Sequence, residues 1–221
     1  MGAIILAGGK GIRLAPLSEV IPKPLIPKGG RPILEIVNHQ LKHQGCRHIT
    51  LAVGYMSDLI QAYFQEGSRW GVSIDYSVES EPLGTAAPPR QISGLDRTYL
   101  VMNADVLTNI NYAKLLRYHK KHQGSATIGA YERQVTIDHG VIIRNGRRHI
   151  SMGVYVFEPE VLDYIGNKAY LDFPDLVKLL LGAGKMVNYY PFSGYWLDVG
   201  RHEDYAKAAE EFEARKGEFS L

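Results

Sequence analysis

The stretch AIILAGGKGIRLAPLSEVIPKPL, residues 3–25, joins a short apolar run to a loop rich in glycine and proline. Residues 3–6 are apolar and β-prone, so they predict a buried strand that ends at Gly8 and Gly9. Backbone N–H groups after a strand can bind anions, and glycine lets a ligand approach them closely. A tight turn from strand to helix would explain the glycines equally well. The glycines alone therefore leave both interpretations open.

Two cations in the same stretch favour anion binding. Arg13 carries a permanent, planar charge that suits phosphate oxygens. Lys23 lies between Pro22 and Pro24, which restrict its backbone, so the lysine can act as a positioned point charge. A simple turn needs neither cation. The dinucleotide spacing GxGxxG and the P-loop pattern GxxxxGK[ST] are both absent from the stretch, so we predict a phosphate-binding loop of another kind.

The N-terminal half alternates apolar runs with helical patterns. Strands are predicted at 49–53, 72–78 and 98–102, and helices at 33–44, 57–64 and 112–122. The run at 72–78 alternates apolar and polar residues, which indicates one wet face or a place near a sheet edge. Continuous apolar strands separated by helices predict an α/β fold, a three-layer αβα arrangement with a mostly parallel sheet.

The C-terminal half has a different pattern. Strand-like runs are ATIGA, HGVII, SMGVYVF and residues 186–190, with helices expected at 160–165, 173–181 and 203–216. The closely spaced runs indicate that the sheet is mixed. No linker, low-complexity tract or internal repeat interrupts the sequence, so we predict a single domain over residues 1–221.

Composition excludes several classes of protein. The net charge of +2 is far from the dense basic surface of a nucleic-acid-binding protein, and Cys46 is the single cysteine, so no disulfide framework is expected. No apolar run is long enough to cross a membrane, and MGAIILAGG lacks the features of a signal peptide. We expect a cytoplasmic protein without nucleic-acid or membrane partners, and a homo-oligomer stays an open alternative.

Two carboxylates follow predicted strands. Asp105 lies in MNADV and Asp198 in YWLDVG. Ligands of an open parallel sheet bind beyond the carboxyl ends of its strands, where two carboxylates could hold Mg²⁺ together with nucleotide phosphates. The alternative for Asp105 is a turn or a helix cap. The segment PLGTAAP (82–88) could contact a base or phosphate through its backbone, or could be an ordinary connection from strand to helix.

These motifs together resemble one family. With GGKGIRL…PKPL, EPLGTA, MNADVL, SMGVYVFEPEVLDYI and GYWLDVGRHEDY in collinear order, the chain resembles the sugar-phosphate nucleotidyltransferases from residue 3 to about residue 210. The resemblance implies a Rossmann-like nucleotide-diphospho-sugar transferase fold. It also implies that an NTP and a sugar 1-phosphate give an NDP-sugar and pyrophosphate, with Mg²⁺ as cofactor. The product would be of the GDP-mannose/heptose or dTDP-glucose type, which favours GTP or dTTP as substrate.

The resemblance also assigns roles to single residues. Arg13 and Lys23 would be catalytic and would bind the nucleotide phosphates and the leaving pyrophosphate. Asp105 and Asp198 would hold Mg²⁺. The nucleotide would contact Leu6, Ala7, Gly8, Gly9, Gly11, Glu79, Pro82, Gly84 and Thr85. The sugar would contact Gly140, Ser151 and Gly153.

The chain departs from the family pattern between Asn145 and Ser151. Family members usually carry a longer segment with a Glu-Lys-Pro whose lysine binds the sugar phosphate, whereas only GRRHI stands here. Either the segment is shortened or a mobile segment is missing from the sequence. If it is shortened, Arg147 or Arg148 substitutes for the lysine, or affinity for the sugar phosphate is poor. The short segment favours the main alternative function, a non-catalytic nucleotide or NDP-sugar sensor or regulatory subunit. A nucleotidyltransferase for another phosphorylated acceptor is disfavoured by SMGVYVFEPEVLDYI.

Overall fold

The computed structural model describes residues 2–28, 30–132, 141–144, 147–167, 170–199, 211 and 214–219. For residues 28, 141–144, 147, 148 and 216 it describes the backbone. The chain forms two compact units. Unit 1 comprises Met1–Pro82, Met102–Asn109 and Tyr195–Leu221, and unit 2 comprises Leu83–Val101 and Ile110–Gly194. That all 221 residues act as a single domain stays a prediction.

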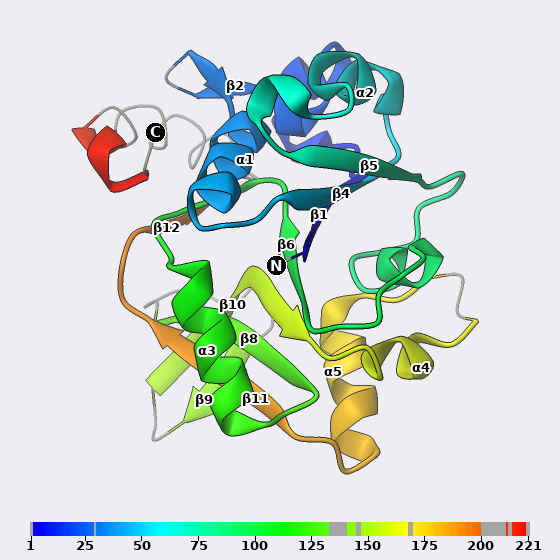
Figure 1. Ribbon diagram of the computed structural model, residues 1–221, viewed down its shortest axis with the longest axis vertical. Coiled ribbons are helices and arrows are strands. Elements are labelled where there is room, and N and C mark those ends of the chain that lie inside the picture. Colours follow the sequence, from blue (N-terminus) through cyan, green and yellow to red (C-terminus); the bar gives the residue numbers. More distant parts are fainter. Residues whose placement is uncertain are drawn as a thin grey trace. The chain divides into compact units, whose positions relative to one another are not determined.

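Unit 1 is built on three parallel strands. β1 (Gly2–Ala7) pairs with β4 (His48–Val53), and β4 pairs with β5 (Ser73–Val78), so that Ala3 lies opposite Ile49 and Ile49 opposite Ile74. Helices α1 (Ile33–His43) and α2 (Ser57–Phe64) connect these strands (Figure 1). β4 is buried beyond its first residue, as its continuous apolar run predicts, whereas β5 alternates between exposed and buried positions at its start.

The predicted phosphate loop follows β1 as three short 3₁₀ turns. These are η1 (Ile12–Leu14), η2 (Leu17–Glu19) and η3 (Lys23–Leu25), followed by the small hairpin of β2 (Pro27–Lys28) and β3 (Arg31–Pro32). A further antiparallel ladder in unit 1 joins β7 (Val106–Thr108) to β12 (Trp196–Asp198). β6 (Tyr99–Asn103) carries the chain from unit 2 into unit 1, just before Asp105.

Unit 2 contains the mixed part of the predicted sheet. β8 (Ala126–Glu132) pairs in parallel with β11 (Val187–Phe192) and antiparallel with β10 (Arg147–Phe157), and β9 (Val141–Arg144) pairs antiparallel with β10. Helix α3 (Tyr112–His122) packs against β8, β10 and β11 (Figure 1). The remaining helices of unit 2 are α4 (Val161–Ile165) and α5 (Phe173–Gly182).

Most predicted elements are confirmed, and the differences are local. Pro88 and Pro89, at the end of the predicted connection 82–88, are buried in a single 3₁₀ turn, η5 (Pro88–Gln91). Both prolines stand at the first positions of this turn, where a helix tolerates proline because the missing N–H would have no partner there. The two other short turns are η4 (Ser68–Trp70) and η6 (Lys216–Phe219). Most of the helix predicted at 203–216 lies outside the described residues.

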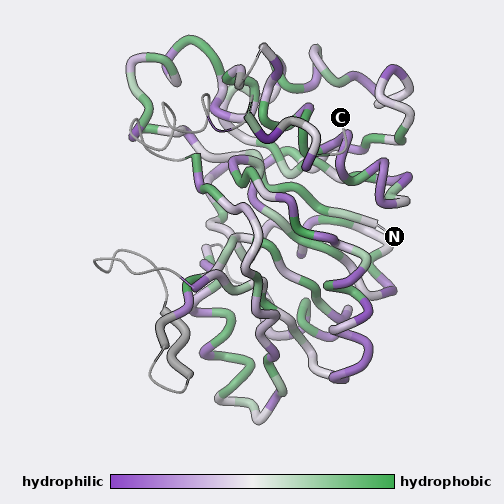
Figure 2. The backbone as a smooth tube through the Cα atoms, turned by 90° about the vertical axis from the view of Figure 1, so that its left-hand side faces the viewer, coloured by the Kyte–Doolittle hydropathy of each residue, from purple (hydrophilic) through white to green (hydrophobic). Residues whose placement is uncertain are grey.

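The strands and the helices together carry the apolar core in each unit. Figure 2 shows hydrophobic and hydrophilic segments alternating along the chain. Ile5, Leu51 and Val53 have no exposed surface in unit 1, and neither do Val154 and Leu176 in unit 2. Among the helices that the structure describes, none is long and apolar enough to span a membrane.

Candidate functional site

The predicted phosphate loop of unit 1 contacts Lys23. Gly11 has a positive φ of 65°, and a Cβ atom added there would lie 3.1 Å from Lys23 Cβ and 3.3 Å from Ser18 Cβ. Ser18 Oγ donates a hydrogen bond of 2.8 Å to the Gly11 carbonyl, which holds the turn in place. Glycine is required at position 11 because it allows both the left-handed backbone and the close approach. Gly11 therefore allows the loop to lie against the lysine.

Lys23 forms an ion pair with Asp105. Lys23 Nζ contacts Asp105 Oδ2, and the two side chains are only 12% and 20% exposed. The second carboxylate oxygen, Asp105 Oδ1, is buried and has no hydrogen-bond partner among the described residues. The structure thus brings together a predicted catalytic cation and a predicted metal ligand that lie far apart in the sequence. It also leaves one carboxylate oxygen available to a ligand.

Asp198 lies on the backbone segment next to Asp105. In the ladder of β7 and β12, Asp198 lies opposite Val106, and the Val199 N–H donates a 3.0 Å hydrogen bond to the Asp105 carbonyl. The described residues contain no cluster of three or more side chains suited to hold a metal. Mg²⁺ is commonly bound through one or two carboxylates, with water and phosphate oxygens completing its shell. The pair of carboxylates and the buried Asp105 Oδ1 fit that type of ion.

Three other predicted ligand contacts of unit 1 are exposed. Arg13 is the middle residue of η1 and is exposed, and its side chain has no hydrogen-bond or ion-pair partner within the described part of the chain. Gly9 and Pro82 are also exposed. Ile12, where the family usually has threonine, is 77% exposed beside Arg13. A guanidinium without a protein partner is available to an anionic ligand.

The end of β1 lies against Glu79. A Cβ atom added at Gly8 would be 2.9 Å from Glu79 Oε1, so the backbone and the carboxylate are in close contact. Ala7 is buried, and the Leu6 carbonyl accepts a 3.0 Å hydrogen bond from the Ala104 N–H. These residues, predicted to contact base and ribose, are thus neighbours in unit 1. The hydrogen bond from Ala104 also places the end of β1 beside the segment that carries Asp105.

Gly84 and Thr85 belong to unit 2. The Thr85 N–H and hydroxyl lie 2.9 and 3.0 Å from Asp172 Oδ1, and Thr85 Oγ1 accepts a 3.0 Å hydrogen bond from the Phe173 N–H. Gly84 has a φ of 79°, and an added Cβ atom would lie 2.6 Å from the Leu171 carbonyl oxygen. The polar groups of Thr85 are therefore bound to the start of α5.

The predicted sugar contacts lie on an irregular part of β10. Its register against β8 shifts between Ser151 and Tyr155, and Gly153 has a φ of 70° within that shift. Ser151 Oγ and the Tyr155 hydroxyl are 2.8 Å apart. Burial raises the pKa of Tyr155 to about 12, although the hydrogen bond with Ser151 opposes this, so the hydroxyl is protonated at neutral pH. Gly140, the third predicted sugar contact, lies outside the described residues.

The contacts that Asp172 and Tyr155 make with predicted site residues were not predicted from the sequence. Asp172 precedes Phe-Pro at a helix start, a position where aspartate is common as a cap, so its type and place indicated an ordinary helix N-terminus. Tyr155 lies within an apolar strand run, which indicated a core residue. No spacing in the sequence connects either residue with its distant partner.

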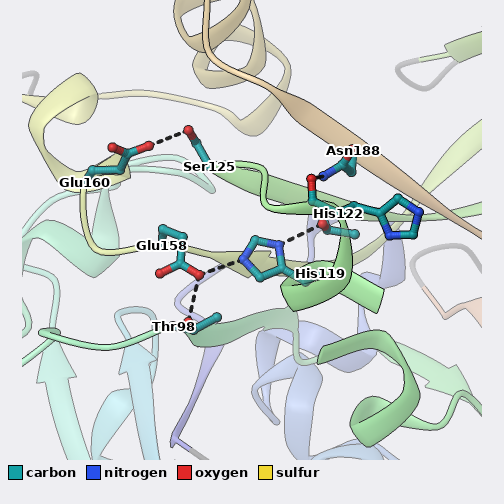
Figure 3. Close-up of polar contacts among 8 residues, drawn as sticks. Thr98, His119, His122, Ser125, Glu158, Glu160 and Asn188 are labelled. Carbon is teal, nitrogen blue, oxygen red and sulfur yellow. Dashed lines mark hydrogen bonds and ion pairs between the residues drawn. The ribbon is translucent and has the colours of Figure 1, made fainter. Parts of the chain in front are cut away.

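A separate polar cluster in unit 2 contains none of the predicted site residues (Figure 3). His119, which is 1% exposed, has Nδ1 2.8 Å from Thr127 Oγ1 and Nε2 2.9 Å from Glu158 Oε1. Thr98 Oγ1 also donates to Glu158 Oε1, at 2.7 Å. A shallow cavity of about 580 Å³ lies over this cluster and includes Ser125 in its lining. Since the cluster members bind one another, we assign the cluster to the attachment of α3.

The sequence matches the family model of the nucleotidyl transferases over residues 2–151 and 144–215. The chain belongs to this family. A mannose-1-phosphate guanyltransferase from Pichia angusta is 35% identical over 228 residues, which cover 93% of this chain and 62% of the relative. A UTP–glucose-1-phosphate uridylyltransferase from Synechocystis sp. is 31% identical over 241 residues, which cover 94% of this chain and 62% of the relative. The chain thus spans about 62% of the length of these relatives.

Comparison with solved structures supports the same assignment at the level of the fold. A Bacillus anthracis protein, described as a glucose-1-phosphate thymidylyltransferase in complex with sucrose, superposes with a TM-score of 0.85. The match covers 96% of this chain and 94% of that one at 24% identity. The predicted fold class, a three-layer αβα fold with a mostly parallel mixed sheet, is confirmed.

Proposed function

We propose that this protein is a sugar-1-phosphate nucleotidyltransferase, which converts an NTP and a sugar 1-phosphate into an NDP-sugar and pyrophosphate. The observation that carries the proposal is the contact between Lys23 and Asp105, with Asp198 on the neighbouring strand. A nucleotidyl transferase needs fixed cations for the phosphates and carboxylates for a divalent ion, and these side chains supply both. The proposal includes a single catalytic domain over residues 1–221 and a cytoplasmic location.

The residues of the loop would act by binding and positioning phosphates. The phosphate oxygen of the sugar 1-phosphate is itself the nucleophile, so the protein needs no nucleophilic side chain. Attack on the α-phosphorus forms the new P–O bond while the bond to the pyrophosphate breaks. Negative charge grows on the leaving pyrophosphate, and the exposed Arg13 and the constrained Lys23 would stabilise it. The contribution of the protein is the alignment of the two substrates.

Asp105 and Asp198 would hold the divalent ion, for which we propose Mg²⁺. A bound Mg²⁺ would neutralise phosphate charge and favour departure of the pyrophosphate. The chain contributes the two carboxylates, and the buried Asp105 Oδ1 is one oxygen that can serve as a ligand. The Lys23 ammonium is paired with Asp105 Oδ2 in the structure. With a divalent ion bound to Asp105 and Asp198, this ammonium could bind phosphate instead.

We propose GTP as the first choice of nucleotide and a mannose- or heptose-type sugar 1-phosphate as its partner. The guanyltransferase from Pichia angusta is 35% identical, compared with 31% for the uridylyltransferase from Synechocystis sp.. The resemblance keeps dTTP with glucose 1-phosphate as the second choice. The proposed nucleotide contacts in unit 1 are Leu6, Ala7, Gly8, Gly9, Gly11, Glu79 and Pro82, and those in unit 2 are Gly84 and Thr85.

The test is release of pyrophosphate with Mg²⁺ across a matrix of GTP, dTTP, UTP and ATP against mannose, heptose and glucose 1-phosphates. Release that requires one NTP and one sugar phosphate together would support the proposal and identify both substrates. Asp105→Asn in the best pair should abolish Mg²⁺-dependent turnover without loss of the fold, as judged by circular dichroism. Lack of release from every pair would contradict the proposed reaction.

A second candidate function, a nucleotide or NDP-sugar sensor, is favoured by the hairpin of β9 and β10. Arg144 lies opposite Arg147, so only residues 145 and 146 separate the two paired strands, where the family usually has a longer segment. Loss of the usual lysine would weaken binding of the sugar phosphate. A sensor would be stabilised against heat by GTP or an NDP-sugar but would release no pyrophosphate.

A further inference from the structure

We infer that Asp172 is a positioning residue that fixes the nucleotide loop at residues 83–86 and connects this loop to Ser151. The inference rests on the proposed function and concerns the same site. Every residue that carries it lies in unit 2. Asp172 acts on a ligand through Thr85 and Gly84, and it has no assigned contact with the substrates.

Asp172 and Thr85 are joined by a set of hydrogen bonds, which we call the clasp. Asp172 Oδ1 accepts two hydrogen bonds, from the Thr85 N–H at 2.9 Å and from the Thr85 hydroxyl at 3.0 Å. The oxygen of that hydroxyl accepts a third, from the Phe173 N–H at 3.0 Å. Hydrogen bonds to an ionised carboxylate are stronger than those between neutral groups. The first turn of α5 therefore holds Thr85 through both its backbone and its side chain.

The carboxylate of Asp172 forms hydrogen bonds with the loop and not with the N–H groups of its own helix. Asp172 is the N-cap residue of α5, yet its side chain accepts no hydrogen bond from the N–H groups of the helix. Its second oxygen, Oδ2, accepts a 2.8 Å hydrogen bond from the Tyr170 hydroxyl. An N-cap aspartate ordinarily stabilises its helix by binding the N–H of the second or third helical residue. Helix capping alone thus does not explain this side chain.

The backbone on either side of the clasp is also fixed. The Leu171 N–H donates to the Leu83 carbonyl at 3.0 Å, and the Ala86 N–H donates to the Leu171 carbonyl at 2.8 Å. Gly84 lies between these two bonds, so close to Leu171 that no side chain would fit. The loop is consequently held to the segment before α5 by hydrogen bonds on both sides of Gly84.

The clasp changes the role expected for Thr85. Its N–H and hydroxyl are both used by Asp172, so Thr85 cannot donate to a nucleotide unless the clasp opens. Its contribution to the site is the conformation that it gives the loop. Loop positions that contact a ligand are most effective when their surroundings hold them rigid, because less entropy is lost on binding.

The same turn of α5 also contacts the strand that carries Ser151. The Phe173 ring lies 3.9 Å from the Tyr155 ring, centroid to centroid, and the Tyr155 hydroxyl is 2.8 Å from Ser151 Oγ. A displacement of the first turn of α5 would therefore disturb the nucleotide loop and the sugar-binding serine together. Asp172 is placed to couple the binding of the two substrates.

The experiment compares Asp172→Ala with Asp175→Ala, a matched control. Asp175 is an exposed carboxylate in the same first helical turn, and it is paired with Lys178 rather than with the loop. Two measurements that do not depend on turnover are made on each full-length variant. Hydrogen exchange at the Thr85 and Ala86 amides reports the loop, and calorimetric titration with GTP, and with dTTP, reports binding.

We expect Asp172→Ala to speed exchange at both amides and to weaken nucleotide binding about tenfold, the scale of one lost hydrogen bond to a charged group. Asp175→Ala should leave both unchanged, and Asp172→Asn, which keeps an acceptor oxygen, should restore much of the protection. In turnover assays the KM for the NTP should rise more than kcat falls. Unchanged exchange or unchanged nucleotide affinity in Asp172→Ala would overturn the inference.

Two milder variants cover the case in which Asp172→Ala does not fold. Thr85→Val removes the hydroxyl with little change of shape, and Thr85→Ser keeps it. Faster exchange and weaker binding in Thr85→Val, but not in Thr85→Ser, would support the clasp, whereas equal behaviour of the two would contradict it. Wild-type protein that releases no pyrophosphate, while nucleotide binding still depends on Asp172, would refute the proposed reaction and leave the positioning role standing.

Discussion

The ammonium of Lys23 and the carboxylate of Asp105 neutralise each other inside unit 1. The lysine is 12% exposed and the aspartate 20% exposed, so water screens neither charge well. One residue comes from the turn η3 after the glycine-rich loop, and the other from the turn that follows β6. The two charges thus balance each other, and in the proposed reaction the Lys23 ammonium would leave Asp105 Oδ2 to bind phosphate.

Loss of either charge should affect both stability and activity. Lys23→Met leaves the Asp105 carboxylate poorly solvated, and we expect the free energy of unfolding to fall by about 1–3 kcal/mol in urea denaturation. The rate of pyrophosphate release should fall by about 10²–10³. The double variant Lys23→Met/Asp105→Asn should lose less stability than the sum of the two single variants.

Lys178→Met is the control for this measurement. Lys178 and Asp175 form an exposed ion pair on α5, with side chains 76% and 59% exposed. Its loss should change the free energy of unfolding by no more than about 0.5 kcal/mol. Equal effects of Lys23→Met and Lys178→Met would mean that the Lys23 pair has no special role.

Arg13 should matter for the rate and not only for affinity. Arg13→Ala removes a cation that we propose to stabilise the leaving pyrophosphate, so kcat should fall by about 10²-fold or more with a smaller change in the KM for the NTP. The measurement is steady-state release of pyrophosphate. Arg97→Ala is the matched control, because Arg97 is 89% exposed and pairs with the neighbouring Asp96. Normal kcat in Arg13→Ala would refute the role assigned to the loop.

Gly84 should tolerate no side chain. Both Gly84 and Gly94 have a positive φ, 79° and 76°, but an added Cβ atom meets the Leu171 carbonyl oxygen at 2.6 Å only at Gly84. Gly94→Ala should cost about 1–2 kcal/mol of backbone strain. Gly84→Ala should cost about 1–3 kcal/mol more through the clash, as measured by chemical denaturation. Equal losses for the two variants would argue that the loop can move away from Leu171.

His119 should contribute to stability through the cluster in Figure 3. His119→Ala leaves Thr127 Oγ1 and Glu158 without their histidine partner and opens a cavity next to β8, so we expect a loss of about 2–4 kcal/mol in thermal or urea unfolding. His122 lies on the same helix but is exposed, and His122→Ala should change stability by less than about 0.5 kcal/mol. A loss below 1 kcal/mol in His119→Ala would contradict the structural role of the cluster.

Local patterns predicted the elements and part of the site. Helix α2 has the predicted bounds, Ser57–Phe64, because apolar residues repeat there at helical spacing, although its N-cap residue is Met56 and no side chain caps it. The constrained Lys23 and the carboxylate Asp105 were singled out by separate motifs, and the structure brings the two into contact. The clasp of Asp172 and Thr85 could not be predicted, since it joins distant residues whose types are equally typical of a cap and a turn.

The division of the chain has a consequence for its synthesis. Unit 1 is assembled from three separate segments, and the last of them contains β12 with Asp198. The residues of the glycine-rich loop and of the Lys23–Asp105 pair are all translated long before β12. The ladder that sets Asp198 beside Asp105 can close only near the end of translation, so a prematurely terminated product would carry the phosphate loop but lack half of the proposed metal site.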